Sequence, residues 1–322
     1  MGTDKMKIIF LGTPGFAVPS LDILVQNGYD IVGVITAPDK PAGRGQKLNE
    51  SEVKKYAVSK GLKVMQPVKL GDPEFLEEVR SLQADLQIVV AFRMMPEALW
   101  SMPKFGTFNL HGSLLPQYRG AAPINRAVMN GEKITGVTTF FLKHEIDTGN
   151  IVFRREIPVG SDETAGELHD RMMVIGADLV LETVKTLESG KMKLYPQSDF
   201  IRSGEELHPA PKIFKEDGRL DFSKSIHQLH NQVRGLSPFP GAFFSLEMPD
   251  GELIQVKVFR SKKEDAGTVL THEILSDGRT FLKIAAADGF LNILELQLPG
   301  KKRMKTEELL RGFKFPSGAV IR

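Results

Sequence analysis

An asparagine and a histidine stand two positions apart at the end of an apolar run, Phe105 to His111. Side chains at i and i+2 of an extended chain share a face, so Asn109 and His111 are predicted to point together beyond a strand end. Asp147 follows later in the turn-forming run Ile146–Gly149, where its carboxylate could fold back toward the imidazole. An amide, an imidazole and a carboxylate together predict an acyl-transfer site.

The hydrophobic pattern predicts a parallel sheet beneath these side chains. Apolar strands are predicted at Lys7–Leu11, Tyr29–Thr36, Lys63–Met65, Leu86–Phe92 and Thr107–His111, and helices at Val18–Asn27, Glu52–Lys60 and Pro73–Leu82. Strands that are apolar throughout and alternate with helices imply a sheet covered on both faces. The Asn109–His111 pair then falls at a strand's carboxyl end, where open α/β sheets bind their ligands.

Two further strands, Gly136–Leu142 and Ile151–Glu156, are predicted to flank Asp147, and a long helix at Ala165–Leu187 closes the domain. Between Gly190 and Pro211 the periodicity fades and prolines accumulate, which is typical of an exposed linker. The predicted organisation is therefore an N-terminal domain at 1–190, a linker at 191–211 and a C-terminal domain at 212–322.

The C-terminal domain shows a different pattern, a helix at Ile226–Arg234 followed by short strands. These strands are predicted at Ala242–Glu247, Leu253–Arg260, Thr268–Leu270, Thr280–Ala285 and Leu291–Leu298. Because Asp-Gly turns separate several of them, they suggest a small closed barrel of the oligonucleotide-binding type.

Composition excludes several classes of protein. The length of 322 residues suits two domains, and a net charge of +2 means that any nucleic-acid affinity must come from local patches. The chain has no cysteine, which excludes disulfides, thiolate metal sites and a cysteine nucleophile. No apolar stretch is long enough to cross a bilayer and no signal-peptide core is present, so we expect a cytoplasmic protein that acts away from membranes.

The order Asn109, His111, Ser113-Leu-Leu-Pro116 and Asp147 resembles the formyltransferases that use 10-formyltetrahydrofolate. The runs 10–14, 41–48 and 118–125 are similar in particular to the branch of that family that formylates methionyl initiator tRNA. The resemblance implies an α/β fold class, with an N-terminal Rossmann-like parallel-sheet formyltransferase domain and a C-terminal OB-fold-like β-barrel that binds tRNA. It also implies a monomer that uses 10-formyltetrahydrofolate in translation initiation.

Formyl transfer gives each of the three polar residues a role. A neutral amine attacks the formyl carbon on N10 of the folate, and the carbonyl oxygen becomes an oxyanion to which Asn109 and a protonated His111 can donate. Asp147 would hold His111 in its protonated form and accept a proton from the amine, directly or through a water. The reaction requires no metal and no covalent enzyme intermediate.

The resemblance also implies a folate site. The turn of Ser113, Leu114, Leu115 and Pro116 is similar to the family's folate-contacting loop, and Phe92 and Met94 would line the pterin pocket. The segment at 92 and 93 departs from the more usual Tyr-Gly, and a methionine pair such as Met94–Met95 is also typical of core packing. The turn at 12–15 lacks the spacing of a dinucleotide-binding loop, and Pro14 removes one donor.

Two basic segments would meet the tRNA. Asp39–Leu48 is predicted to be a flexible loop, and the resemblance places its Arg44, together with Lys47, in the acceptor stem. After residue 300 the chain has seven basic and two acidic residues, an excess of +5 that includes Lys301, Lys302 and Arg303 and suits phosphate contacts. Ordinary solvated surface is the alternative interpretation of both segments.

Two other functions remain compatible with the sequence. One is a formyltransferase that acts on an amino sugar nucleotide or on glycinamide ribonucleotide. The other is a nucleic-acid-binding protein whose α/β domain has lost catalysis, which the intact set of Asn109, His111 and Asp147 disfavours.

Overall fold

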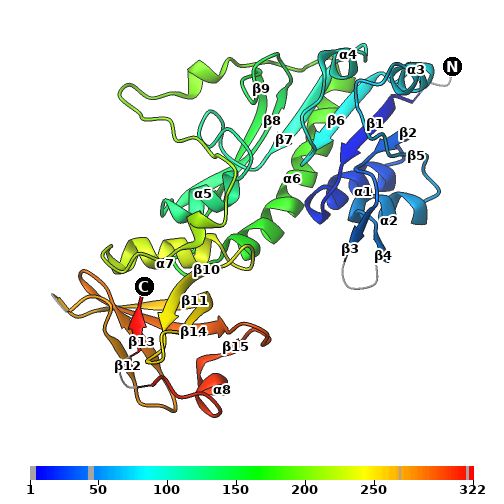
Figure 1. Ribbon diagram of the computed structural model, residues 1–322. Coiled ribbons are helices and arrows are strands. Elements are labelled where there is room, and N and C mark those ends of the chain that lie inside the picture. Colours follow the sequence, from blue (N-terminus) through cyan, green and yellow to red (C-terminus); the bar gives the residue numbers. More distant parts are fainter. Residues whose placement is uncertain (1–4, 43–46, 268–269, 317–318) are drawn as a thin grey trace. The chain divides into compact units, whose positions relative to one another are not determined.

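The computed structural model describes residues 5–42, 47–267, 270–316 and 319–322 (Figure 1). The chain forms two compact units, each assembled from separated stretches. Unit 1 comprises Met1–Pro123, Gly136–Ile157 and His169–Pro209. Unit 2 comprises Ile124–Thr135, Pro158–Leu168 and Ala210–Arg322. The predicted division into 1–190, 191–211 and 212–322 stays a prediction.

Unit 1 is built around a sheet whose order, over the described residues, is β5–β2–β1–β6–β7–β8–β9. Its strands are β1 (Lys7–Gly12), β2 (Asp30–Ile35), β5 (Val64–Met65), β6 (Leu86–Val90), β7 (Thr107–His111), β8 (Ile134–Phe141) and β9 (Ile151–Pro158). The strands from β5 to β7 run parallel, and β8 pairs antiparallel with β7. The chain winds from β1 to one edge and then back through β6 to the other, so the topological switch lies between β1 and β6, next to the strand that carries Asn109 and His111.

Helices cover this sheet and begin where capping residues allow. They are α1 (Val18–Gln26), α2 (Glu52–Ser59), α3 (Pro73–Ser81), the short α4 (Glu97–Trp100) and α6 (Ala165–Glu188), of which His169 onward belongs to unit 1. Ser51 caps α2 by accepting from the backbone of Lys54. α6 packs closely on β7, because a Cβ on Gly176 would stand 2.7 Å from the side chain of Leu110.

Unit 2 holds an antiparallel, barrel-like sheet in the order β12–β13–β14–β11–β10–β16 over its described residues, with β15 paired to β14. The strands are β10 (Ala242–Glu247), β11 (Leu253–Asp265), β12 (Ile274–Ser276), β13 (Leu282–Ala285), β14 (Gly289–Gln297), β15 (Met304–Lys305) and β16 (Val320–Ile321). The helices are α5 (Pro123–Met129), nearly all of it in this unit, α7 (Ile226–Gly235) and α8 (Thr306–Leu310). The predicted fold class, a Rossmann-like parallel sheet plus a small barrel, is confirmed.

Two local predictions need correction, and a third lies mostly outside the described residues. Strand β6 ends at Val90 rather than Phe92, because Ala91 has φ of +48° and leaves the extended conformation. The predicted flexible loop is in part a hairpin, in which β3 (Lys40–Ala42) pairs antiparallel with β4 (Lys47–Asn49) and residues 43–46 lie outside the described part. The predicted strand at Thr268–Leu270 falls mostly outside the described residues, and Leu270 itself is irregular.

The helices of the described part include none that could span a membrane.

Candidate active site

Asn109 and His111 occupy the last part of β7, as predicted. Asn109 lies level with Val89 on β6 and Phe140 on β8, while His111 lies level with Thr138. His111 is 6% exposed, and the Oδ1 atom of Asn109 is buried with no hydrogen-bond partner among the described residues. A buried polar atom without a partner costs free energy unless a ligand or water supplies one. The amide oxygen of Asn109 is therefore available to a bound molecule.

The tautomer of His111 follows from its backbone partner. Its Nε2 lies 2.8 Å from the carbonyl oxygen of Tyr118. A carbonyl only accepts, so Nε2 must carry a proton and donate it. The other ring nitrogen, Nδ1, lies 3.9 Å from Oδ2 of Asp147. Nδ1 is consequently the atom through which the imidazole can serve both the carboxylate and a substrate.

Asp147 is held toward His111 by an unusual backbone conformation. Its φ is +55°, in the left-handed region, and its Oδ2 accepts a hydrogen bond of 3.0 Å from the backbone of Gly120. Gly120 and Tyr118 belong to one loop, so a single segment fixes both the imidazole and the carboxylate. The structure thus brings His111 and Asp147 together, with Asn109 on the same strand as His111.

The turn after His111 is anchored to β8. Ser113 donates from Oγ to the carbonyl of Gln117 at 2.6 Å, and its own carbonyl accepts from Thr138 Oγ1 at 2.7 Å. The Leu115 backbone donates to the same threonine oxygen at 3.1 Å. Ser113, Leu115 and Pro116 are buried and Leu114 is half-buried. Mainly Leu114 and backbone groups of this turn are therefore available to a ligand.

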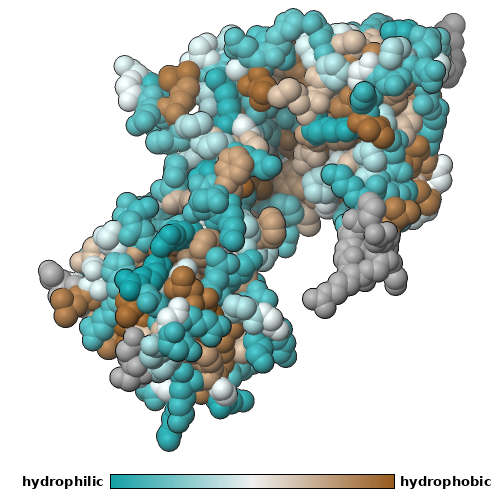
Figure 2. All heavy atoms as spheres, viewed as in Figure 1, coloured by the Kyte–Doolittle hydropathy of each residue, from teal (hydrophilic) through white to brown (hydrophobic). Residues whose placement is uncertain are grey.

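The predicted pterin-lining residues lie beyond the end of β6. Phe92 and Met95 are half-buried and pack against the core around Leu99, whereas Met94 is 75% exposed. Arg93 donates from Nη1 to the carbonyl of Val68 at 3.0 Å, which ties this segment to the chain before α3. The core-packing alternative therefore holds for Met95 and not for Met94. Figure 2 shows a hollow with hydrophobic side chains in its wall where β6 and β7 end in Figure 1.

The predicted tRNA-contacting residues differ in how much of them the structure describes and in whether their charges are paired. Arg44 lies outside the described residues, and only the backbone of Lys47, in β4, is described. Lys301, Lys302 and Arg303 are exposed near the β14–β15 turn. Arg303, however, pairs with Glu295 through Nε at 2.7 Å and lies 4.7 Å above the ring of Phe259. The charge of Arg303 is thus offset by a partner outside the basic segment.

Sequence reasoning missed Gln197, which contacts the Asp147 turn. The segment 191–211 is mostly exposed, as predicted, but Gln197 is only 5% exposed. Its Nε2 donates to the carbonyl of Asp147 at 2.7 Å, and its Oε1 accepts from Arg119. Nothing in the local sequence signals this role, because the partners lie far away along the chain.

Unit 2 contains a polar pocket of about 420 Å³ bordered by Arg126, Arg219 and Asp217. Arg126 is ion-paired with Asp217 at 3.1 Å, so the charges of this pocket are partly balanced from within. Over the described residues, no three His, Asp or Glu side chains converge as metal ligands would.

Comparison with known proteins finds formyltransferase relatives for both the N-terminal and the C-terminal part of the chain. Residues 6–184 match the family model described as formyl transferase, and residues 212–314 match the formyl transferase C-terminal domain. Methionyl-tRNA formyltransferase from Bacteroides fragilis is 53% identical over 97% of this chain and 97% of its own length. The protein of that name from Porphyromonas gingivalis is 45% identical over the full length of both chains, 100% of each.

Solved structures share the fold at lower identity. An N-formyltransferase from Helicobacter canadensis, bound to folinic acid and dTDP-3-aminofucose, covers 93% of this chain and 100% of its own, with 21% identity and a TM-score of 0.63. HypX from Aquifex aeolicus, bound to tetrahydrofolic acid, covers 95% of this chain and 47% of its own, with 20% identity and a TM-score of 0.60.

Proposed function

Because the chain belongs to the formyltransferase family, and within it to the methionyl-tRNA formyltransferases, we propose that it transfers a formyl group from 10-formyltetrahydrofolate to the free amino group of methionyl initiator tRNA. The product serves translation initiation. The observation that carries the proposal is the pair of His111 and Asp147 at the carboxyl end of the parallel sheet, beside Asn109, whose buried Oδ1 has no hydrogen-bond partner among the described residues. The enzyme acts in the cytoplasm as a monomer and needs no metal.

The reaction exchanges one carbon–nitrogen bond for another. The amine nitrogen of the methionyl group forms a bond to the formyl carbon, and the carbonyl electrons move onto oxygen to give a tetrahedral oxyanion. When the carbonyl re-forms, the bond from carbon to N10 of the folate breaks and N10 takes up a proton. The amine loses one proton on the way. The site must therefore stabilise an oxyanion and accept a proton.

The three polar side chains divide this work. The amide of Asn109, with its N–H group turned to the ligand, and His111 donating from Nδ1 stabilise the oxyanion, and losing one such donor typically costs about 100- to 1,000-fold in rate. Asp147 lies on the Nδ1 side of His111, where a carboxylate stabilises the protonated imidazole. Asp147 also takes the amine proton, directly or through a water.

The folate lies against the turn formed by Ser113, Leu114, Leu115 and Pro116. Since Ser113 and Leu115 are buried, this turn binds through its backbone and through Leu114. Phe92 and Met94 line the pterin site, and the high exposure of Met94 leaves its side chain free to cover a ligand.

The tRNA is bound by basic residues at two places in the chain. Arg44, between β3 and β4 in the sequence, and Lys47, the first residue of β4, contact the acceptor stem, and Lys301, Lys302 and Arg303 contact phosphates. Among the last three, the two lysines contribute more, because Arg303 already pairs with Glu295. In this scheme residues 1–190 form the catalytic domain, 191–211 the linker and 212–322 the tRNA-binding barrel.

The test is a comparison of acceptors with purified enzyme and labelled 10-formyltetrahydrofolate. Methionyl initiator tRNA, an amino sugar nucleotide and glycinamide ribonucleotide are supplied separately. The proposal expects efficient transfer to the tRNA and little to the others. Efficient transfer to either small acceptor, or tRNA binding without transfer to any acceptor, would assign the chain to one of the two alternative functions.

A further inference from the structure

The side chain of Gln197 is buried between two loops of unit 1 and uses all of its hydrogen-bonding groups. Its Nε2 donates to the carbonyl oxygens of Asp147, at 2.7 Å, and Gly149, at 3.0 Å. Its Oε1 accepts from Nε and Nη2 of Arg119, at 3.0 and 2.6 Å. Only a neutral amide of this length can donate twice on one side and accept on the other. Gln197 is therefore matched to these partners by chemistry as well as by size.

Gln197 reaches these loops because the chain before it is fixed to β9. Tyr195 and Ile151 exchange backbone hydrogen bonds of 2.8 and 2.9 Å, and Gln197 follows two residues later at the start of a 3-10 turn, Gln197–Phe200. The side chain then faces the 147–150 turn, which immediately precedes β9. A residue of the segment 191–211 is thereby built into the candidate active site.

The turn that Gln197 holds is under conformational strain. Asp147 is a non-glycine residue with φ of +55°, and such a conformation persists only where the surroundings impose it. Gly149 has no room for a side chain, because a Cβ there would stand 1.6 Å from the carbonyl oxygen of Phe141. Nε2 of Gln197 donates to the carbonyls on both sides of Thr148 in this tight turn, so it holds Asp147 in its left-handed conformation.

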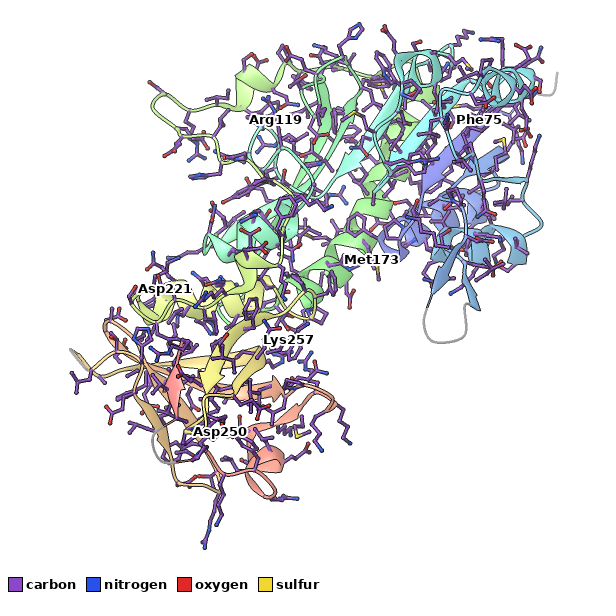
Figure 3. All side chains as sticks on the ribbon, viewed as in Figure 1. Phe75, Arg119, Met173, Asp221, Asp250 and Lys257 are labelled. Atoms are coloured by element: carbon purple, nitrogen blue, oxygen red, sulfur yellow. The ribbon has the colours of Figure 1, made fainter. Side chains whose placement is uncertain are left out.

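Arg119 connects this turn to the loop that orients His111. Tyr118, just before it, accepts from Nε2 of His111, and Gly120, just after it, donates to Oδ2 of Asp147. Arg119 itself, labelled in Figure 3, holds Gln197. The contacts form a closed ring that runs from His111 through residues 118–120 and Gln197 to Asp147. Moving Gln197 would shift the carboxylate relative to the imidazole.

We propose that Gln197, held by Arg119, is a positioning residue for Asp147 and sets its place beside His111 during formyl transfer. The inference rests on the proposed function for the reaction that is measured. A displacement of about 1 Å in a catalytic group can cost about 100-fold in rate, so loss of Gln197 is expected to lower kcat about 10- to 100-fold. The KM values for folate and tRNA should change little, since Gln197 is not among the residues proposed to contact either.

Two substitutions of Gln197 separate its donors from its acceptor. Gln197→Glu keeps the contact with Arg119 but replaces the two N–H groups by an oxygen that faces two carbonyls. Gln197→Met keeps the length and removes every polar contact. Arg119→Met tests the same ring from the other side without altering Gln197. All three are expected to lower kcat.

Matched controls report on stability alone. Thr183→Val removes a buried hydrogen bond of 2.9 Å between α6 and Thr139 of β8, in the same unit but away from Asp147. Gln26→Glu makes the same chemical change as Gln197→Glu on the exposed surface of α1. Both controls should retain the kcat of the wild type, even where Thr183→Val lowers the melting temperature.

The decisive measurement is a double-mutant cycle in kcat between Gln197→Met and Asp147→Asn. If Gln197 acts through Asp147, adding Gln197→Met to Asp147→Asn should lower kcat further by less than about 3-fold. The inference would be overturned if the two losses in kcat multiplied in the double variant. It would also be overturned if the single Gln197 and Arg119 variants kept the kcat of the wild type. A wild type that transfers no formyl group to methionyl-tRNA would instead refute the proposed function, so the two failures are distinguishable.

Discussion

At the scale of single residues, the site depends on which ring nitrogen of His111 is committed to the backbone. The Tyr118 carbonyl accepts from Nε2, so a protonated ring presents its second N–H from Nδ1 on the side of Asp147. At 3.9 Å the carboxylate is too far for a full hydrogen bond, so it does not occupy the Nδ1 position. In the proposed mechanism, Nδ1 is therefore left to donate to the oxyanion.

Removing either partner should disable catalysis without unfolding the protein. His111→Ala deletes the donor and Asp147→Asn deletes the negative charge, so each is expected to lower kcat for formyl transfer by at least about 100-fold. Rates at saturating substrates, together with melting curves and tRNA binding, check this prediction. A loss of only a few fold in either variant would remove that residue from the mechanism.

Part of this site could be predicted from the sequence and part could not. The two-residue spacing of Asn109 and His111 and the apolar strand before them are local signals, and the structure has that strand at the predicted residues. The carbonyl of Tyr118 and the amide of Gln197 have no such signal. Both come from loops whose positions depend on tertiary contacts, so the residue types alone do not indicate what they touch.

At the scale of elements, α7 and the loop before α6 form a second buried polar cluster, in unit 2. His230 of α7 is 2% exposed, and its Nδ1 lies 3.0 Å from Oγ of Ser261. Its Nε2 lies 3.2 Å from the carbonyl of Ser161 and from Oδ1 of Asp162. Burial lowers the pKa of His230 below its usual value, with Lys263 and Arg234 acting in the same direction and Asp162 opposing them.

This cluster predicts a loss of stability on acidification. Because the native pKa of His230 is lowered, the unfolded chain binds more protons once the pH falls below about 6.5, and the free energy of unfolding decreases down to the native pKa. At pH values above this range, the contribution of His230 to the free energy of unfolding is fully present. His230→Gln should flatten this part of the pH dependence, measured as the urea midpoint at several pH values.

The control for that experiment is His227→Gln, on the exposed side of the same helix. It should leave the pH dependence of the wild type in place. An unchanged slope for His230→Gln would show that other groups cause the acid sensitivity.

The β14–β15 turn predicts a salt effect on tRNA binding. Lys301→Glu combined with Lys302→Glu should weaken tRNA binding. The slope of log affinity against log salt concentration should become less steep by roughly one to two, because fewer counterions are released. Turnover at saturating tRNA should change little. Lys191→Glu with Lys193→Glu, an equal change of charge on the exposed part of unit 1, is the control. An identical slope in both double variants would make the 301–303 cluster ordinary solvated surface.

At the scale of the whole molecule, the alternation of strands and helices was enough to predict a parallel sheet, but the interleaving of the two units was not. The stretches 124–135 and 158–168 belong with the C-terminal part because of distant contacts. Asn125 donates to the carbonyl of Gly235 at 2.8 Å, and Arg234 donates to the carbonyl of Gly160 at 3.2 Å. Hydrophobic periodicity reports which face of an element is buried and does not identify its partner. Short elements such as β15, β16 and α8 were missed because they have too few residues to show a hydrophobic period.

The net charge of +2 is too small to attract nucleic acid by itself, so the proposed function needs local basic residues, which lie far apart in the sequence. If Arg44 makes its contact only in the correct complex, Arg44→Ala should reduce the ratio of kcat/KM for initiator over elongator methionyl-tRNA, with folate affinity unchanged. Both tRNAs are measured side by side with wild type and variant. Equal fractional losses on the two would leave the barrel as the element that discriminates.

The central claim is most directly tested by the identity of the product. Wild-type protein is incubated with 10-formyltetrahydrofolate and methionyl initiator tRNA, the ester bond to the tRNA is hydrolysed, and the released amino acid is analysed by mass spectrometry. The predicted result is N-formylmethionine, formed with a matching amount of tetrahydrofolate. Recovery of unmodified methionine, from tRNA that the protein demonstrably binds, would contradict the account.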